Sequence, residues 1–439
     1  MRQAQLLIVV LCAGVVAGCQ GGSSGPTCSF DDAAVMARST WPKFRHDERN
    51  TGTVDSSAVY TGLATNPGML RWVFPPFDET SKGPFPASPS LNADESHLYI
   101  GSSDSTLYGL LTATGTRDTN FAFAALSGIT STALLAVRDG QDAIFVGSND
   151  SHIYGLNATG QVLQNTDWPF SFPGFVSASP TFANDGSGTI YGGSGNGFVF
   201  GLCPNGVSRW GVSITSTQSS PAIGADGSVI FGADDHQLRA LRGDGNFRWA
   251  FSTAGAVTTA VVIDAPSANA QESAIYVADR TGRVFKVDNN GQPDKAFAAA
   301  TVGPISSSPA LVGNHLIFGS DDGNVYAIDK HTGQETWTFA TNAPVQSSPA
   351  VVIAAGMPPV LAVGSNDGTV YFLQDNGTSA INYGSFVIGA PIHSSPAVDQ
   401  HGTVYVGADD GRVYAIGSPL ATPTATPTVV GPTPTPTAL

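Results

Sequence analysis

The sequence predicts an all-β protein, an eight-bladed β-propeller with four-stranded blades whose ring is closed by an N-terminal strand. Two observations predict this fold: a unit of about 44 residues that recurs eight times, and a composition that disfavours helices. The 439 residues include 51 Gly and 29 Pro, and only 12% are charged, roughly half the usual share. Hydrophobic residues make up 41%. That share supports a large core and argues against disorder over most of the chain.

Each repeat begins with a short anchor of small residues, typically Ser-Ser-Pro, which suits the crowded innermost strand of a blade. The spacing of these anchors lies within the range of propeller blades, about 40–50 residues. The eight anchors are Ala87-Ser88-Pro89, Ser131-Thr132-Ala133, Ala178-Ser179-Pro180, Ser219-Ser220-Pro221, Thr258-Thr259-Ala260, Ser307-Ser308-Pro309, Ser347-Ser348-Pro349 and Ser394-Ser395-Pro396.

A hairpin of two apolar strands follows every anchor, as in residues 316–328 and 404–416, where an Asp-Gly turn joins the strands. A fourth, outer strand is predicted after seven of the hairpins, with an aromatic residue that fills the wedge between neighbouring blades. The eighth outer strand is predicted at 70–74, before the first anchor, so that it completes the last blade and hides the open edges of the ring. The seven aromatic residues are Phe123, Trp168, Trp210, Trp249, Phe297, Trp337 and Tyr383.

The two ends of the chain are predicted to lie outside the ring. Residues 1–18 have the charge and apolar run of a signal peptide, and the sequence before Cys19 resembles a bacterial lipobox, which implies lipidation of Cys19. We expect a flexible tether at 19–40, the propeller at 41–417 with its ring at about 60–417, and a disordered Thr/Pro-rich tail at 418–439. For Cys28 and Cys203, a disulfide and two free thiols are equally compatible with the sequence.

The net charge is −15, and the chain has no basic run. Nucleic acid is therefore excluded as an expected partner, because phosphate neutralisation dominates that kind of binding. The only membrane contact predicted is the one through the lipid anchor, and the chain is expected to be a monomer.

One repeat carries a recognisable motif between its third and fourth strands, at Ala327, Asp329, Thr332, Gly333 and Trp337. These residues resemble the tryptophan-docking motif of the pyrroloquinoline-quinone-like (PQQ-like) β-propeller repeat family. The segment 41–52 is similar to the lead-in of many such proteins. The resemblance implies a structural role for the motif: Asp329, Thr332 and Gly333 form a turn, and Trp337 packs against the neighbouring blade.

Quinoprotein dehydrogenases resemble this chain in having an eight-bladed ring, so the sequence must be compared with their catalytic features. Those enzymes carry a vicinal Cys pair, and this sequence has none, nor a Cys-x-x-Cys-His haem site. The Asp-Asp turns at 234, 321 and 409 are distributed one per blade, so we interpret them as hairpin turns rather than as calcium ligands. We therefore expect no enzyme activity, no cofactor, no metal and no catalytic residue.

The remaining candidates for function are uneven loops between the first and second strands of three blades, which fall on one face of the ring. They contain Arg138 and Asp139, Asp264 and Glu272, and Met357.

The leading hypothesis is a lipid-anchored protein-binding scaffold of the bacterial envelope. We expect it at the outer membrane facing the periplasm, with the cell surface as the other location. A lipobox and an eight-bladed ring are also features of the outer-membrane assembly lipoprotein of the β-barrel insertion machinery, which the chain resembles. The alternatives are a PQQ-dependent dehydrogenase and a surface ligand- or carbohydrate-binding propeller.

Overall fold

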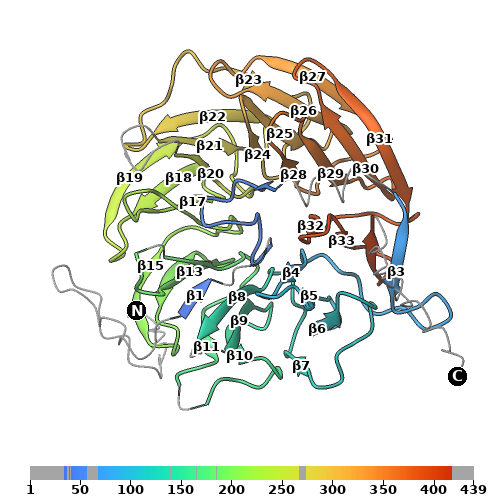
Figure 1. Ribbon diagram of the computed structural model, residues 1–439. Coiled ribbons are helices and arrows are strands. Elements are labelled where there is room, and N and C mark those ends of the chain that lie inside the picture. The colour runs from blue at the N-terminus through green and yellow to red at the C-terminus, as the bar shows by residue number, and fades with distance from the viewer. Residues whose placement is uncertain are drawn as a thin grey trace, which may run out of the picture.

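The computed structural model of the chain describes residues 34–36, 39, 41–56, 68–138, 141–164, 166–183, 185–265 and 273–417. Within these ranges every regular element is a β-strand, and the strands form eight separate sheets. The sheets are arranged as the blades of a ring, and the chain passes from blade to blade in sequence order (Figure 1). The predicted eight-bladed propeller is confirmed.

Each blade is an antiparallel meander whose first strand is the innermost. Blades 1 to 4 consist of β4 (Ser90–Leu91), β5 (His97–Gly101), β6 (Thr106–Leu111) and β7 (Phe123–Ala124); β8 (Leu134–Arg138), β9 (Gln141–Gly147), β10 (His152–Asn157) and β11 (Phe170–Ser171); β12 (Thr181–Phe182), β13 (Ile190–Ser194), β14 (Phe198–Leu202) and β15 (Ser208–Ser213); and β16 (Ala222–Ile223), β17 (Val229–Ala233), β18 (Gln237–Leu241) and β19 (Phe247–Ser252).

Blades 5 to 7 repeat this order, and blade 8 takes its outer strand from the N-terminal side of the chain. They consist of β20 (Val262–Asp264), β21 (Ala274–Ala278), β22 (Arg283–Asp288) and β23 (Ala299–Ala300); β24 (Ala310–Val312), β25 (His315–Gly319), β26 (Asn324–Asp329) and β27 (Glu335–Ala340); β28 (Ala350–Ile353), β29 (Val360–Gly364), β30 (Thr369–Asp375) and β31 (Ala380–Val387); and β32 (Ala397–Val398), β33 (Val404–Gly407), β34 (Val413–Ile416) and β3 (Leu70–Phe74).

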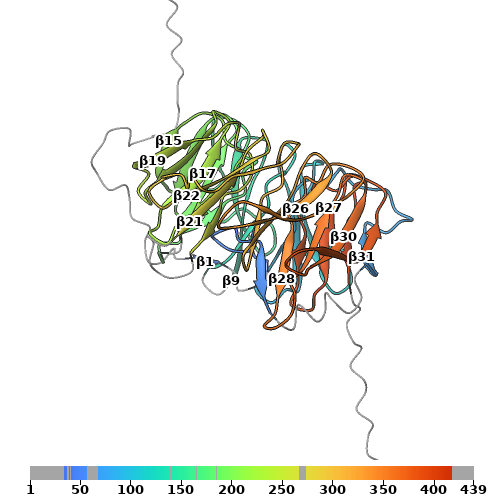
Figure 2. The same cartoon turned by 90° about the horizontal axis from the view of Figure 1, so that it is seen from above.

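Ring closure depends on β3, which pairs antiparallel with β34 in a register that runs from Leu70↔Ile416 to Phe74↔Val413. In Figure 1 the blue β3 lies against the red last blade. Figure 2 shows the ring from its edge, with β15 and β19 on one side and β27 and β31 on the other. The prediction that residues 70–74 complete the last blade is confirmed, and this pairing covers the outer edge of β34.

Two further strands lie inside the ring. β1 (Ala34–Met36), which falls in the range predicted as a tether, pairs antiparallel with β8, and β2 (Thr53–Asp55) pairs parallel with β28. We call residues 41–56 the axial segment, because this blue stretch crosses the centre of the ring (Figure 1). Its carbonyl groups accept backbone hydrogen bonds of 2.8–3.1 Å from the inner strands of blades 1, 2, 4, 5, 6 and 7. The segment therefore ties together blades that are distant in sequence.

The anchors link each blade to the next through a belt of hydroxyl groups. A backbone N–H at the second anchor position donates to the hydroxyl of the following blade over 2.8–3.2 Å, and the last link runs from Ser395 back to Ser88. In blade 5 the predicted anchor, residues 258–260, is wrong by one residue. Its hydrogen bonds place Thr259, Ala260 and Val261 at the anchor positions, rather than residues 258–260. Because Ala260 has no hydroxyl, the belt is interrupted between blades 4 and 5.

The hydrophobic core lies between the blades, where a small residue at the end of each second strand receives a bulky side chain from the next blade. A Cβ built on Gly319 would lie 2.3 Å from Cγ1 of Val345, which is far inside contact distance. Gly101, Gly147, Gly232 and Gly364 face Ile129, Val176, Val257 and Ile392 in the same way. Glycine at these positions is thus a requirement of close blade packing.

Five tryptophans fill the outer wedges and donate their indole N–H to the next blade over 2.8–2.9 Å: Trp72, Trp168, Trp210, Trp249 and Trp337. Two predicted wedge residues are corrected. Tyr383 is 41% exposed, and in its blade the buried Phe372 is paired with Gly384 instead. In blade 1 the buried residue is Phe121, which lies over Gly109, while Phe123 is only half-buried.

Candidate functional site

The residues of the recognised motif connect blade 6 to both of its neighbours. Asp329 ends β26, and its Oδ1 accepts hydrogen bonds from the backbone N–H and the hydroxyl of Thr332, at 2.8 and 2.9 Å. Gly333 has a φ of +76°, and a Cβ there would lie 2.8 Å from the backbone of Ala298 in blade 5. Trp337 is 4% exposed and pairs with Ala327 across the blade. The turn thus lies against one neighbour, and the indole reaches the other.

The indole N–H of Trp337 donates to Oδ1 of Asp375 in blade 7 over 2.9 Å. The same carboxylate accepts from the N–H of Gly377 at 2.8 Å, and its Oδ2 lies 2.7 Å from Nδ1 of His315. Burial pulls the pKa of Asp375 upward, but the bonds from His315, Gly377 and Trp337 outweigh burial and lower it. The pKa of His315 is raised, chiefly by its hydrogen bond to Asp375. This group is a buried polar junction between blades.

The axial segment brings charged side chains into the centre of the ring. The guanidinium of Arg45 is 1% exposed and donates over 2.5 Å to the anchor carbonyls of Pro309 and Pro349. Gly52 leaves the space that this guanidinium occupies, since a Cβ there would lie 2.1 Å from Nη2. Burial lowers the pKa of Arg45 to about 9 and that of Lys43 to about 8. Lys43 donates to Asp47 O and Asn50 Oδ1, at 2.8 and 2.6 Å.

Three of the predicted loop residues can be placed, and they do not form a single site. Arg138 ends β8 in blade 2, Asp264 ends β20 in blade 5, and Met357 is 52% exposed in the turn between β28 and β29 of blade 7. Because the first strands of all blades run in the same direction, these loops share one face but lie around its rim. Asp139, Glu272 and Cys19 are outside the described residues.

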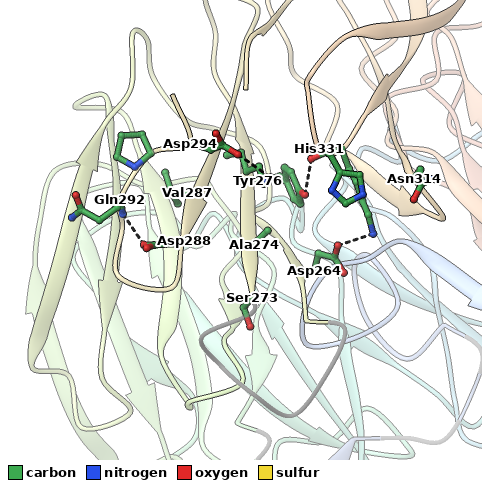
Figure 3. A pocket seen from close by; sticks show the side chains of 13 residues that line it. Asp264, Ser273, Ala274, Tyr276, Val287, Asp288, Gln292, Asp294, Asn314 and His331 are labelled. Carbon is green, nitrogen blue, oxygen red and sulfur yellow. Dashed lines mark hydrogen bonds and ion pairs between the residues drawn. The ribbon is translucent and has the colours of Figure 1, made fainter. Parts of the chain in front are cut away.

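A pocket of about 560 Å³ adjoins Asp264 between blades 5 and 6 (Figure 3). Its cations are paired: Lys330 Nζ lies 2.8 Å from Asp264, and Lys286 Nζ lies 2.9 Å from Asp294. The hydrogen bond from Lys286 is the main cause of a lowered pKa at Asp294. The hydroxyl of Tyr276 donates to the carbonyl of Lys330, and burial raises its pKa. The pocket is therefore polar and both of its lysines are paired, while its third carboxylate, Asp288, accepts backbone N–H groups of Asn290 and Gln292.

The hairpin turns show what their acidic residues do. Asp322 accepts from the N–H of Asn324 at 3.0 Å and from the hydroxyl of Tyr326 at 2.9 Å. The same Asp–Tyr pair occurs at Asp104, Asp150, Asp367 and Asp410. Within the described ranges no three His, Cys, Asp or Glu side chains come together as metal ligands. The carboxylates of these turns bond to groups of their own hairpins.

The described residues do not match the quinone site of quinoprotein enzymes. The resemblance implies that such a site would have a calcium ion and a catalytic Asp near the axis. Here the axial segment places Lys43, Arg45 and Asn50 in the centre: Arg45 and Asn50 bond to blade carbonyls, and Lys43 bonds to Asn50. Among the described residues Arg45 Nε has no hydrogen-bond partner. Cys203 is buried and disulfide-bonded, and the other cysteines lie outside the described residues. In the part of the chain that is described, no helix has the length and apolarity to cross a bilayer.

Sequence reasoning missed the buried charges of the axial segment and the pocket beside Asp264. The lead-in at 41–52, which resembles that of other PQQ-like propellers, was the available signal for the first. The pocket had no comparable signal. Its lining residues come from strands and turns of two blades, and only the fold brings them together.

Comparison with curated proteins gives two short matches. The chain is 32% identical over 114 residues to the beta-alanine-activating enzyme of Danio rerio, a match to 25% of this chain and 10% of that protein. It is 26% identical over 161 residues to outer membrane protein assembly factor BamB of Yersinia pestis, a match to 33% of this chain and 39% of that protein. The chain thus matches well under half the length of either relative.

Two solved structures match about three quarters of the chain. The crystal structure of BamB from Moraxella catarrhalis matches with a TM-score of 0.57 and 17% identity, over 76% of this chain and 96% of that one. The computationally designed Ika8 protein matches with a TM-score of 0.60 and 16% identity, over 77% and 98%. At these identities the likeness shows the fold alone.

A family profile described as outer membrane protein assembly factor BamB matches residues 149–301 and 293–418. The two matches together cover more than half of the chain and include blades 3 to 8 with β34. They also contain the motif that ends at Trp337. The chain therefore belongs to the PQQ-like β-propeller family that carries the BamB description.

Proposed function

We propose that this protein is a non-enzymatic scaffold of the bacterial cell envelope, which binds other proteins and takes part in outer-membrane protein assembly. Membership of the BamB-described family and the match to the Yersinia pestis relative support this role. We further propose that the protein acts as a monomer, held at the outer membrane and facing the periplasm.

The axial segment is the feature that favours a scaffold over an enzyme. It joins six blades through backbone hydrogen bonds, and Arg45 and Asn50 add side-chain bonds to blades 4, 5, 6 and 7. A ring fixed at its centre presents the loops of each face at constant spacing. Constant spacing suits recognition of a protein surface, because little conformational entropy is lost on binding.

The ends of the chain would supply the attachment. We propose residues 1–18 as a signal peptide, Cys19 as the lipidated residue and 418–439 as a spacer tail. The tether predicted at 19–40 is shortened to 19–33, because residues 34–36 pair with blade 2. Replacement of Cys19 by Ser should move the protein from the membrane to the soluble fraction. Membrane association that is unchanged in Cys19→Ser would contradict the anchor while leaving the scaffold role open.

A photo-crosslinking amino acid at Met357 tests the binding face. Met357 is exposed in a loop between the first and second strands, whereas Ile381 is exposed to a similar extent, 47% against 52%, on the outer strand β31. We expect crosslinking in intact envelopes to join Met357, and not Ile381, to a discrete envelope protein. A product at neither position, or the same product at both, would count against this face as the scaffold surface.

A further inference from the structure

Blade 3 departs from the other seven blades at two positions near the ring axis, on the face opposite the axial segment. The first is Phe175, whose counterparts are small residues or proline. The second is Gly195, whose counterparts are polar. The counterparts of Phe175 are Pro84, Gly128, Ser216, Ala256, Pro304, Pro344 and Pro391, and those of Gly195 are Ser103, Asn149, Asp234, Arg280, Asp321, Asn366 and Asp409.

The two departures are in contact with each other. A Cβ built on Gly195 would lie 2.0 Å from Cζ of Phe175. The phenyl group of Phe175 therefore occupies the space that a side chain takes in every other blade. The N–H of Gly195 also donates to the carbonyl of Phe175 over 2.8 Å. Phe175 remains 37% exposed in this position. Gly195 thus allows the phenyl group of Phe175 to lie at the central opening of the propeller.

Phe175 lines a pocket of about 580 Å³, together with Thr130, Asn149, Ser177, Gln218 and Thr258. None of these six residues is charged, although the protein carries 53 Lys, Arg, Asp and Glu residues. The hydroxyl of Ser177 is buried and has no hydrogen-bond partner within the described ranges. An unsatisfied buried hydroxyl is unfavourable, and a ligand group that bonds to it would relieve this.

Several charged residues of the same face are paired with one another on blades 5, 6 and 8. Arg280 lies 3.2 Å from Asp321, which also accepts from Gln346 at 3.1 Å. His393 lies 3.1 Å from Asp409. The residues that line the pocket beside Phe175 therefore include no cation for an anionic ligand and no carboxylate for a cationic one, although Asp234 of blade 4 lies on the same face.

We propose that this pocket binds a neutral oligosaccharide. Hydroxyl and amide side chains both donate and accept hydrogen bonds, and sugar hydroxyls do the same, so the two sets are complementary. An exposed aromatic ring can pack against the apolar C–H face of a pyranose. A peptide would be recognised chiefly along its backbone by an unpaired strand edge, and the pocket is formed by turn residues and by residues that precede the inner strands.

Titration calorimetry of the purified full-length protein with maltotriose, cellotriose and triacetylchitotriose tests the proposal, with a Gly/Ser hexapeptide as the comparison. We expect one of the three sugars to bind saturably at one site. Phe175→Ala should weaken its Kd about tenfold or more, the loss of a well-packed aromatic contact. Phe247→Ala is the control, because Phe247 is 63% exposed on β19, away from the pocket, and should leave the Kd unchanged.

Gly195→Asp gives a second variant that keeps Phe175 in the sequence. It introduces the residue type found in blades 4, 6 and 8 and displaces the ring, so the affinity should fall as in Phe175→Ala. The proposal is overturned if no sugar binds at about 10 mM, if the hexapeptide alone binds, or if both variants keep the full affinity. Thermal melting of each variant separates lost binding from lost folding.

Discussion

Replacement of Trp337 by Phe tests how the blades are held together, and Trp249 provides a matched control. Both indoles are nearly buried, 4% and 8% exposed, and both pair with an alanine across the blade, Ala327 and Ala240. Their donors differ in one respect: Trp337 donates to the carboxylate of Asp375, and Trp249 donates to the backbone carbonyl of Asn289. The two substitutions therefore remove the same apolar volume but different hydrogen bonds.

Hydrogen bonds to charged groups contribute about 1.5–3 kcal/mol, against about 1 kcal/mol for a neutral pair. We thus expect Trp337→Phe to lower the free energy of unfolding by about 1 kcal/mol more than Trp249→Phe. Urea denaturation followed by far-ultraviolet circular dichroism at pH 7 measures the difference.

The pH dependence gives a second measurement of the same bond. The folded pKa of Asp375 is lowered, so the stability it contributes is present above its ordinary pKa of 3.8 and is lost as pH falls through the folded pKa. The gap between the two variants should therefore close in acid. Equal losses at pH 7, or a larger loss in Trp249→Phe, would refute the account of the carboxylate as the stronger acceptor.

Three other substitutions test the centre of the ring and the blade contacts. Lys43 has a folded pKa of about 8 against 10.5. Between these pH values the unfolded state therefore binds more protons than the folded state. The free energy of unfolding of the unsubstituted protein, relative to that of Lys43→Met, should rise on the order of 3 kcal/mol from pH 7 to pH 10.5. A difference that does not change with pH would show that Lys43 is not buried as a cation. Gly319→Ala should destabilise by about 1–3 kcal/mol because its Cβ meets Val345, whereas Gly128→Ala, whose nearest neighbour would lie at 3.4 Å, should be neutral in the same urea assay. Ala260→Ser supplies the missing belt hydroxyl and should stabilise by about 0.5–1.5 kcal/mol, seen as a higher melting temperature; a lower one would mean that the site has no room for the hydroxyl.

Much of the fold follows from the sequence because the repeat is local. The anchors, the Asp-Gly hairpins and the N-terminal closing strand each have a short signature, and the structure has all three. Tyr383 was wrongly assigned to a wedge because an aromatic residue at the right spacing does not reveal which face of a strand it occupies. The blade-5 anchor was misplaced by one residue because Thr258 and Thr259 both match the pattern, and only the hydrogen bonds distinguish them.

The candidate sites were less predictable for a physical reason. Lys43 and Arg45 are charged, and such residues are normally assigned to the surface; their burial depends on carbonyl groups from blades 6 and 7 and on Asn50, which only the folded ring brings near them. Neither Phe175 nor Gly195 indicates a binding site when its position is considered alone. Their significance appears when all eight blades are compared position by position.

The pairing of β3 with β34 has a consequence for the order in which the protein can form. Some 340 residues separate the paired strands, so a chain that emerges from its N-terminus must wait for its last strand before the ring can close. The axial segment waits as well, because the carbonyl groups that Arg45 binds belong to blades 6 and 7. Pairings of such long range are slow to form. The newly made chain therefore passes through a period in which β3 is unpaired and the blades are not yet locked, and a truncation that removes β34 would make that state permanent.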